Sequence, residues 1–137
     1  MTLVLDASIT LAWYFNDEGS AATDAVLDDV VAQGAVVPML WRLEVANALQ
    51  MALRRERITS DYRDAALADL AQLDIRVDPE TSDHAWTATL QLADRYRLTL
   101  YDAAYLELAQ RRRLGLATMD GALQHAAKLC DVRVLGI

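Results

Sequence analysis

A series of short apolar runs, each followed by a segment of helical character, constrains the fold of this chain more than any other feature. The first run is Leu3-Val4-Leu5, at the start of the sequence. Three successive apolar residues are typical of a strand that is buried on both faces. Such strands belong to parallel sheets with helices on each side, so the pattern predicts an α/β fold.

The same alternation continues along the whole chain. Further strands are expected at residues 35–37, 75–77, 114–118 and 132–135. Helices are expected at residues 8–15, 20–33, 39–57, 60–73, 81–97, 102–113 and 120–129. Because neither a linker nor an internal repeat interrupts the pattern, residues 1–137 are expected to form a single domain. Its predicted architecture is a small parallel sheet of four to five strands flanked by helices.

The composition predicts an ordered domain. Apolar residues make up 54% of the chain, and no low-complexity tract is present. No apolar run reaches the length of a membrane span, and the N-terminus lacks the features of a signal peptide. Cys130 is the single cysteine, and no cysteine–histidine set has the spacing of a zinc site. We therefore expect a cytoplasmic protein without a membrane partner.

The net charge of −7 is unusual for a protein that binds nucleic acid. However, a cluster of carboxylates that holds divalent cations would account for part of this excess, and local basic patches can still meet phosphates. The three arginines at 111–113 end a helix, where cations are favourable, and we do not assign them to a site. The bulk charge alone therefore decides little about the ligand.

Three aspartates stand where helices are expected to begin. Asp6 follows the first strand, Asp120 follows the strand at 114–118, and Asp102 opens the helix at 102–113. Each has a simple structural interpretation, because aspartate is a preferred N-cap residue. In an open α/β sheet, however, ligands bind at the carboxyl ends of the parallel strands. A site shared by these carboxylates is therefore the alternative interpretation.

Glu44 favours the shared site. It is expected mid-helix, where no cap is needed, on a stripe with Leu40, Trp41 and Ala48 that faces inward. A buried carboxylate requires a partner, because an unpaired buried charge is very costly. The alternative is a buried ion pair with a distant arginine. Asn47 is the next polar residue on the same face.

Four carboxylates gathered in one place repel one another. Two unit charges about 4 Å apart repel by roughly 4 kcal/mol at an effective dielectric constant near 20. Such a cluster is stable only when it is protonated or neutralised by cations. Hard oxygen ligands without histidine or cysteine suit Mg²⁺ or Mn²⁺, and either ion can activate water and stabilise charge on a phosphate under attack.

Four segments of the chain resemble, in order and spacing, the motifs of PIN-domain nucleases. Within that family the chain is most similar to the VapC-type toxins of prokaryotic toxin–antitoxin pairs. The segments are Val4-Leu5-Asp6-Ala7-Ser8, Leu43-Glu44-Val45-Ala46-Asn47-Ala48-Leu49, Tyr101-Asp102-Ala103-Ala104-Tyr105 and Thr118-Met119-Asp120. The likeness covers essentially the whole chain, and the combination of the four motifs makes it specific.

The resemblance implies a three-layer α/β/α PIN-like domain and a Mg²⁺- or Mn²⁺-dependent endoribonuclease that hydrolyses RNA. The catalytic and metal-binding residues it carries over are Asp6, Glu44, Asp102 and Asp120, with Ser8, Asn47 and Thr118 as polar support. It also implies a homodimer and a cognate antitoxin that lies across the site. Some relatives carry another acid after the last aspartate, whereas Gly121 and Ala122 follow Asp120 here, which puts a second metal ion in doubt.

Other functions fit the sequence less well. A receiver domain of a response regulator requires paired acids after its first strand and a lysine after its last, and this chain has neither. A haloacid-dehalogenase-like phosphatase requires an aspartate where Ser8 stands. A catalytically silent PIN-type module that only binds a partner remains the main alternative. Cleavage of RNA with Mg²⁺, stopped by EDTA, separates it from a nuclease.

Overall fold

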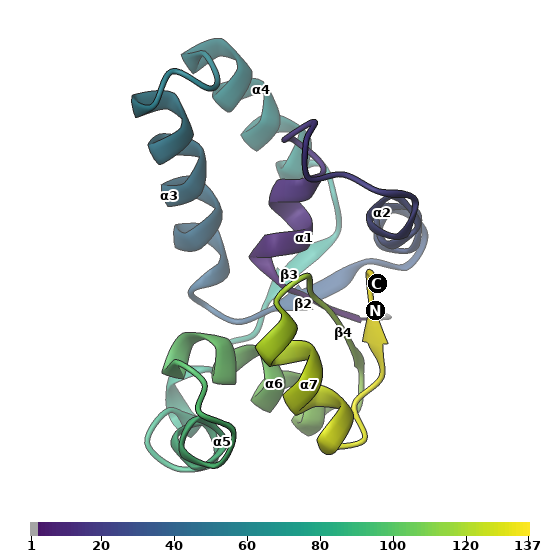
Figure 1. The fold of residues 1–137 in the computed structure, drawn as a ribbon, viewed down its shortest axis with the longest axis vertical. Coiled ribbons are helices and arrows are strands. Elements are labelled where there is room, and N and C mark those ends of the chain that lie inside the picture. The colour runs from purple at the N-terminus through teal and green to yellow at the C-terminus, as the bar shows by residue number, and fades with distance from the viewer. Residues whose placement is uncertain (1–2) are drawn as a thin grey trace.

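A computed structural model describes residues 3–137 as a five-stranded sheet between two layers of helices (Figure 1). The strands are β1 (Leu3–Leu5), β2 (Ala35–Val37), β3 (Ile75–Val77), β4 (Gly115–Ala117) and β5 (Val134–Leu135). Their order is β3-β2-β1-β4-β5, and every pair is parallel. All five strands fall within the segments predicted from the sequence. The α/β/α architecture is therefore confirmed.

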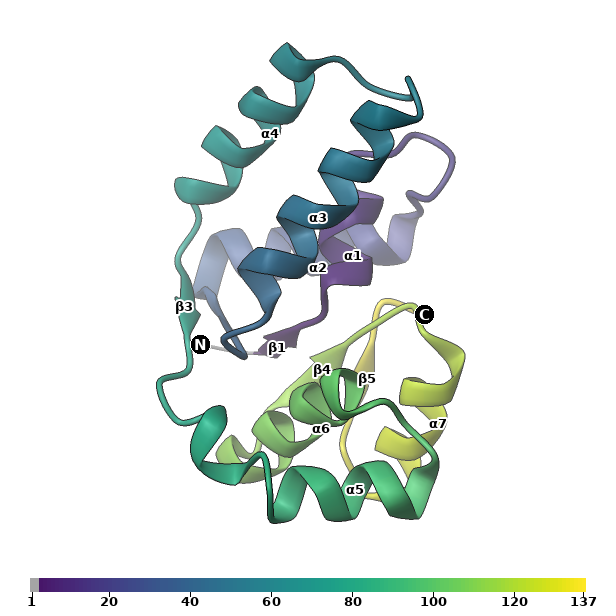
Figure 2. The ribbon, with the colours of Figure 1, turned by 90° about the vertical axis from the view of Figure 1, so that its left-hand side faces the viewer.

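Seven helices and one 3₁₀ turn cover the sheet. They are α1 (Ala7–Ala12), α2 (Ala21–Gln33), α3 (Trp41–Arg54), α4 (Ser60–Ala71), η1 (Ser82–His84), α5 (Ala88–Tyr96), α6 (Leu100–Arg112) and α7 (Gly121–Leu129). Figure 2 shows α1 to α4 on one side of the strands and α5 to α7 on the other. None of the helices within residues 3–137 has the length and apolar character that a membrane span requires.

The centre of the sheet forms the core. Leu3, Val4 and Leu5 are at most 1% exposed, as expected for a strand covered on both faces. The register pairs Leu5 with Ala117, so that the residues after β1 and β4 leave the sheet side by side. The amide of Asp6 extends this pairing by donating a 3.0 Å hydrogen bond to the carbonyl of Ala117.

The prediction of one helix over residues 81–97 is wrong. The structure has η1 at Ser82–His84 and α5 from Ala88, with a turn between them in which Thr87 leaves the helical region at φ −120° and ψ −101°. Threonine is a weak helix former, and after this turn α5 packs along α6 (Figure 2). Tertiary packing thus overrides the local helical pattern.

The start of α3 is tied to α1. This helix begins at Trp41 and ends at Arg54, within the expected range of 39–57. The indole N–H of Trp41 donates a 3.2 Å hydrogen bond to the Thr10 hydroxyl, which in turn donates to the backbone carbonyl of Asp6 at 3.3 Å. The first turn of α3 is therefore held at a fixed place relative to the end of β1.

A buried ion network joins the end of β3 to the end of α6. The Asp78 side chain is fully buried and accepts hydrogen bonds from Arg111 at 2.6 Å and Arg112 at 3.0 Å. Arg111 also pairs with Glu107 at 2.8 Å. Burial alone would raise the pKa of Asp78, but the two arginines outweigh it and hold that pKa below its ordinary value. These arginines stabilise the fold, in line with their exclusion from the predicted site.

Candidate acidic active site

Asp6 lies at the carboxyl end of the central strand β1 and is only 6% exposed. It occupies the N-cap position of α1, yet its side chain makes no capping hydrogen bond. Its Oδ2 atom instead accepts hydrogen bonds from the Ser8 hydroxyl at 2.8 Å and the Thr118 hydroxyl at 2.7 Å. The N-cap interpretation of the Asp6 side chain is therefore wrong.

Two backbone amides fix the direction of these hydroxyl protons. The Ser8 oxygen accepts the amide of Met119 at 3.0 Å, and the Thr118 oxygen accepts the amide of Asp120 at 3.0 Å. Since each hydroxyl has a single proton, that proton remains for the Asp6 carboxylate. The loop after β4 is thereby tied to Asp6 by hydrogen bonds. Ser8 and Thr118, which the sequence analysis named as polar support, thus both donate to the Asp6 carboxylate.

Asp120 is both a helix cap and a neighbour of Asp6. Its Oδ1 atom accepts the amide of Leu123 at 3.0 Å, which caps α7. Through the Asp120 amide and the Thr118 hydroxyl it also belongs to the network around Asp6. The capping interpretation is therefore correct for Asp120, and the residue still stands beside the buried carboxylate.

Asp102 does not cap its helix. The helix α6 begins at Leu100, two residues earlier than predicted, and Thr99 is its N-cap. The Thr99 hydroxyl accepts the amide of Asp102 at 3.1 Å. Consequently the Asp102 carboxylate lies in the first helical turn, where the positive end of the helix dipole favours negative charge.

Glu44 also lies in a first turn, that of α3, and not mid-helix as predicted. It is partly exposed, and the buried stripe of the helix consists of Trp41, Val45, Leu49 and Ala52. The Tyr105 hydroxyl donates a 2.5 Å hydrogen bond to Oε1 of Glu44. The alternative interpretation, a buried ion pair with an arginine, is therefore wrong for Glu44.

The four carboxylates interact electrostatically. Burial raises the pKa of Asp6, hydrogen bonds from Thr118 and Ser8 oppose this rise, and the charge of Asp120 adds to it. Burial also raises the pKa of Glu44; the Tyr105 hydrogen bond opposes this effect, and the charges of Asp6 and Asp102 add to it. Residues from four separate segments thus form one electrostatic cluster.

Asp102 completes this cluster. Burial is the largest cause that raises the pKa of Asp102, and the charges of Asp120 and Asp6 raise it further. The hydrogen bond with Thr99 opposes this rise. By contrast, Asn47, predicted as polar support, is exposed, and its side chain makes no hydrogen bond within residues 3–137. Its role stays a prediction.

The sequence reasoning missed Tyr105. It lies one turn after Asp102 on α6, is fully buried and donates to Glu44. The available signal was a tyrosine three residues after an acid on a helix, since residues i and i+3 share a face. Nothing in the sequence identified Glu44, 61 residues away, as the partner.

The donor chemistry of the cluster fits a hard divalent cation. It consists of carboxylate oxygens with neighbouring hydroxyls, and burial, with mutual repulsion as a smaller cause, raises the pKa values of Asp6, Glu44 and Asp102. Nevertheless, within residues 3–137 no three acidic, histidine or cysteine side chains already stand in a metal-holding arrangement. The residues fit the cation by chemistry and charge, without forming a closed cage.

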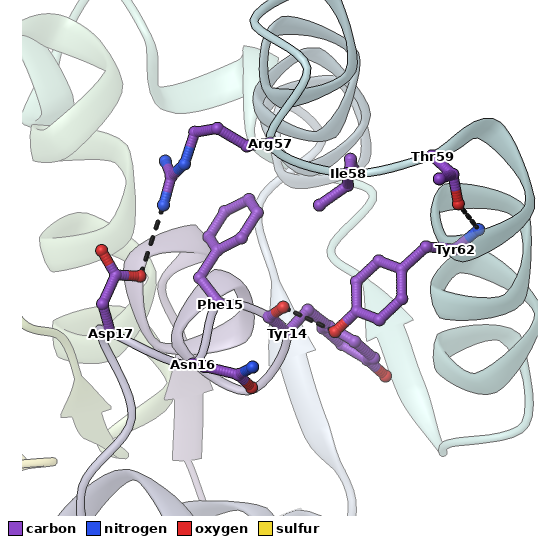
Figure 3. Close-up of a pocket in the computed structure, with 8 residues that line it drawn as sticks. All are labelled: Tyr14, Phe15, Asn16, Asp17, Arg57, Ile58, Thr59 and Tyr62. Atoms are coloured by element: carbon purple, nitrogen blue, oxygen red, sulfur yellow. Dashed lines mark hydrogen bonds and ion pairs between the residues drawn. The ribbon is translucent and has the colours of Figure 1, made fainter.

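A pocket of about 490 Å³ lies elsewhere, between the end of α1 and the turn from α3 to α4 (Figure 3). Arg57 stacks over the Phe15 ring at 4.8 Å and pairs with Asp17 at 3.3 Å. The hydroxyl of Tyr62 donates a 2.6 Å hydrogen bond to the Tyr14 carbonyl. Because none of the four carboxylates lines this pocket and its charged groups are paired, it is separate from the acidic cluster.

Known structures with the same fold come from several prokaryotes. The crystal structure of PAE2754 from Pyrobaculum aerophilum matches with a TM-score of 0.63 and 24% identity, over 92% of this chain and 86% of that chain. A toxin–antitoxin complex from Klebsiella pneumoniae contains a chain that matches with a TM-score of 0.61 and 17% identity, over 87% of each chain. At these identities the likeness establishes the fold.

Sequence comparison establishes the family. The PIN domain model matches residues 3–129. Ribonuclease VapC3 of Pyrobaculum aerophilum is 30% identical over 123 residues, which cover 90% of this chain and 92% of that protein. Together with the parallel sheet and the acidic residues at its edge, these matches show that the chain belongs to the PIN-domain family and, within it, to the VapC-type proteins.

Proposed function

We propose that this protein is an endoribonuclease, the toxin of a toxin–antitoxin pair, and that it hydrolyses RNA phosphodiester bonds with Mg²⁺ or Mn²⁺. The proposed ligands and catalytic residues are Asp6, Glu44, Asp102 and Asp120. The observation that carries the proposal is the electrostatic coupling of these four carboxylates, which come from four separate segments. The name of the similar protein from Pyrobaculum aerophilum, a ribonuclease, supports RNA as the substrate.

The residues of the chain have distinct tasks in this proposal. Two hydroxyl donors, Ser8 and Thr118, partly offset the cost of burying a charge on Asp6. Asp102 and Asp120 stand at helix starts, where the helix dipole favours negative charge. Once bound, a divalent cation would supply a nucleophilic water and neutralise charge on the phosphate, giving 3′-hydroxyl and 5′-phosphate ends.

We further propose a cognate antitoxin as partner, a homodimer as the assembly and the cytoplasm as the location. The complex from Klebsiella pneumoniae, which pairs a toxin with an antitoxin, supports the first of these. Large apolar side chains at the surface support protein partners in general: Leu43 is 75% exposed and Trp86 is 90% exposed.

The direct test is incubation of the purified protein with RNA. Cleavage is expected with Mg²⁺ or Mn²⁺ and none with EDTA, and the products are expected to carry 5′-phosphates that a phosphatase removes. A protein that binds Mn²⁺ and an antitoxin without cutting any RNA offered would instead be the silent binding module. Cleavage that persists in EDTA would contradict the metal-dependent mechanism.

A further inference from the structure

Tyr105 contacts one of the proposed metal ligands, Glu44, from the helix that carries another, Asp102. It lies on α6, three residues after Asp102, and is 0% exposed. Its hydroxyl donates a 2.5 Å hydrogen bond to Oε1 of Glu44 on α3. Since α3 and α6 cover opposite sides of the sheet, this bond spans the two helical layers (Figure 2).

The partner of the hydroxyl is unusual for a core tyrosine. A buried phenol requires a hydrogen-bond acceptor, and a backbone carbonyl is enough to satisfy it. Here the acceptor is instead a partly exposed carboxylate on a helix of the other layer. Within residues 3–137 this is also the only hydrogen bond that the Glu44 carboxylate accepts. The bond therefore determines the orientation of that carboxylate.

Glu44 is thus fixed from two directions. The hydrogen bonds from Trp41 to Thr10, and from Thr10 to the carbonyl of Asp6, hold the first turn of α3 beside β1. The Tyr105 hydroxyl then sets the direction of the carboxylate at the end of the Glu44 side chain. An arginine or lysine in the same place would neutralise the carboxylate and compete with a cation, whereas the neutral phenol orients it and leaves its charge in place.

We propose that Tyr105 is a positioning residue of the nuclease site, acting through Glu44. This inference rests on the proposed function, since it assigns the Tyr105 hydroxyl to the support of a metal ligand. Hydrogen-bond partners of metal ligands typically contribute about 10–100-fold to metal affinity or activity. The change Tyr105→Phe separates positioning from packing, because the phenylalanine ring fills the same space but has no hydroxyl to hold Glu44.

The test compares Tyr105→Phe with the wild type by Mn²⁺ titration, followed by thermal unfolding. The Mn²⁺ concentration at half-saturation is expected to rise about 10-fold or more, with a similar fall in the rate of RNA cleavage. Tyr62→Phe is the matched control. It also removes a hydrogen-bonded tyrosine hydroxyl, but in the pocket away from the carboxylates (Figure 3). Its Mn²⁺ titration is expected to match the wild type.

A double-mutant cycle distinguishes action through Glu44 from a general effect on the fold. In a Glu44→Gln background, the additional change Tyr105→Phe is expected to alter Mn²⁺ half-saturation less than about 2-fold. Equal effects of Tyr105→Phe in both backgrounds would overturn the proposal. So would a Tyr105→Phe protein that melts at a lower temperature in EDTA yet keeps the wild-type Mn²⁺ titration.

A measurement on the wild type keeps the proposal testable if Tyr105→Phe does not fold. Because the Tyr105 hydroxyl is buried and hydrogen-bonded, its proton is expected to be observable by NMR, and its resonance is expected to shift as Mg²⁺ saturates the protein. A resonance that stays in place would overturn the proposal for Tyr105 while leaving the nuclease intact. A wild type that neither binds Mn²⁺ nor cleaves RNA would overturn the proposed function, and the inference about Tyr105 with it.

Discussion

At the scale of single residues, the three aspartates that stand near helix starts have different structural roles. Asp120 caps a helix, whereas the N-cap next to Asp102 is Thr99 and the Asp6 side chain makes no capping bond at all. The carboxylates of Asp6 and Asp102 are therefore not explained by helix capping. A site that requires negative charge does explain them.

A fourth aspartate, Asp78, serves the fold. We predict that Asp78→Asn lowers the free energy of unfolding by about 3 kcal/mol at pH 7, because it breaks a buried ion pair with Arg111. Urea unfolding measures this difference. Asp64→Asn is the control: Asp64 pairs with Arg63 but is 65% exposed, so its loss is expected to cost less than about 1 kcal/mol.

The pH dependence of the Asp78 effect has a definite sign. Because its pKa in the folded protein lies below the ordinary 3.8, Asp78 stabilises the fold fully above pH 3.8. That contribution is lost as the pH falls through the lower folded value. The two proteins are therefore expected to converge in stability at acidic pH. A constant difference down to pH 2 would show that the ion pair is not its cause.

The sequence predicts which residues gather, but not their hydrogen-bond partners. Asp6 and Asp120 follow from the rule that parallel strands end at one edge of the sheet. Asp102 comes after α5 and not after a strand, and its place in the predicted site came from the resemblance. The donors Ser8 and Thr118 are close in sequence to these acids, and the resemblance identified them. The bond from Tyr105 to Glu44 joins helices 61 positions apart in the chain, and no local pattern encodes such a distance.

At the scale of elements, strands were more predictable than helix starts. Three successive apolar residues mark a buried strand, as at Leu3–Leu5 and Ala35–Val37. Helix starts depend on which neighbouring polar residue provides the cap. For α6 the sequence analysis placed the start at Asp102, whereas the structure uses Thr99 as the cap. The break before α5 follows from packing on α6, which a local pattern does not contain.

The start of α7 permits a test of two roles in one residue. We predict that Asp120→Ala lowers the free energy of unfolding by about 1 kcal/mol, because the cap on the Leu123 amide is lost. Asp120→Asn, which caps about as well as aspartate, is expected to keep wild-type stability. Both variants are expected to lose RNA cleavage, since both remove the charge. Thermal unfolding in EDTA and a cleavage assay measure the two effects separately.

At the scale of the whole molecule, the clustered carboxylates lower stability in the absence of a cation. Burial raises the pKa values of Asp6, Glu44 and Asp102 above the ordinary 3.8 for aspartate and 4.5 for glutamate. At pH values between the ordinary and the raised pKa, the folded protein therefore binds more protons than the unfolded chain. In EDTA, the free energy of unfolding is therefore expected to rise as the pH falls from 7 towards about 4.5.

A divalent cation should reverse that dependence. Mn²⁺ at about 100 times its dissociation constant is expected to add roughly 2.7 kcal/mol to the free energy of unfolding at pH 7. The gain is expected to be smaller at pH 5, because protons compete with Mn²⁺ for the same carboxylate oxygens. Urea unfolding across this pH range, with Mn²⁺ and with EDTA, measures both effects. Stability that increases with pH in EDTA would contradict the raised pKa values.

The central claim is that Asp6 and Asp102 are metal ligands of a nuclease, and two nearly isosteric changes test it most directly. Asp6→Asn and Asp102→Asn each remove one negative charge, and Asp61→Asn, in the first turn of α4 after another threonine cap, is the matched control. The measurement is the rate of RNA cleavage in Mn²⁺, beside the melting temperature in EDTA.

For Asp6→Asn and Asp102→Asn we predict that the rate of RNA cleavage falls by more than about 10–100-fold. That range is the typical loss when a hydrogen-bond partner of a metal ligand is removed, and loss of a ligand itself should cost more. Their melting temperatures in EDTA are expected to be unchanged or higher, because a costly buried charge is gone. Asp61→Asn is expected to cleave RNA like the wild type. If Asp6→Asn and Asp102→Asn also cleave RNA at the wild-type rate, the acidic cluster is not the active site.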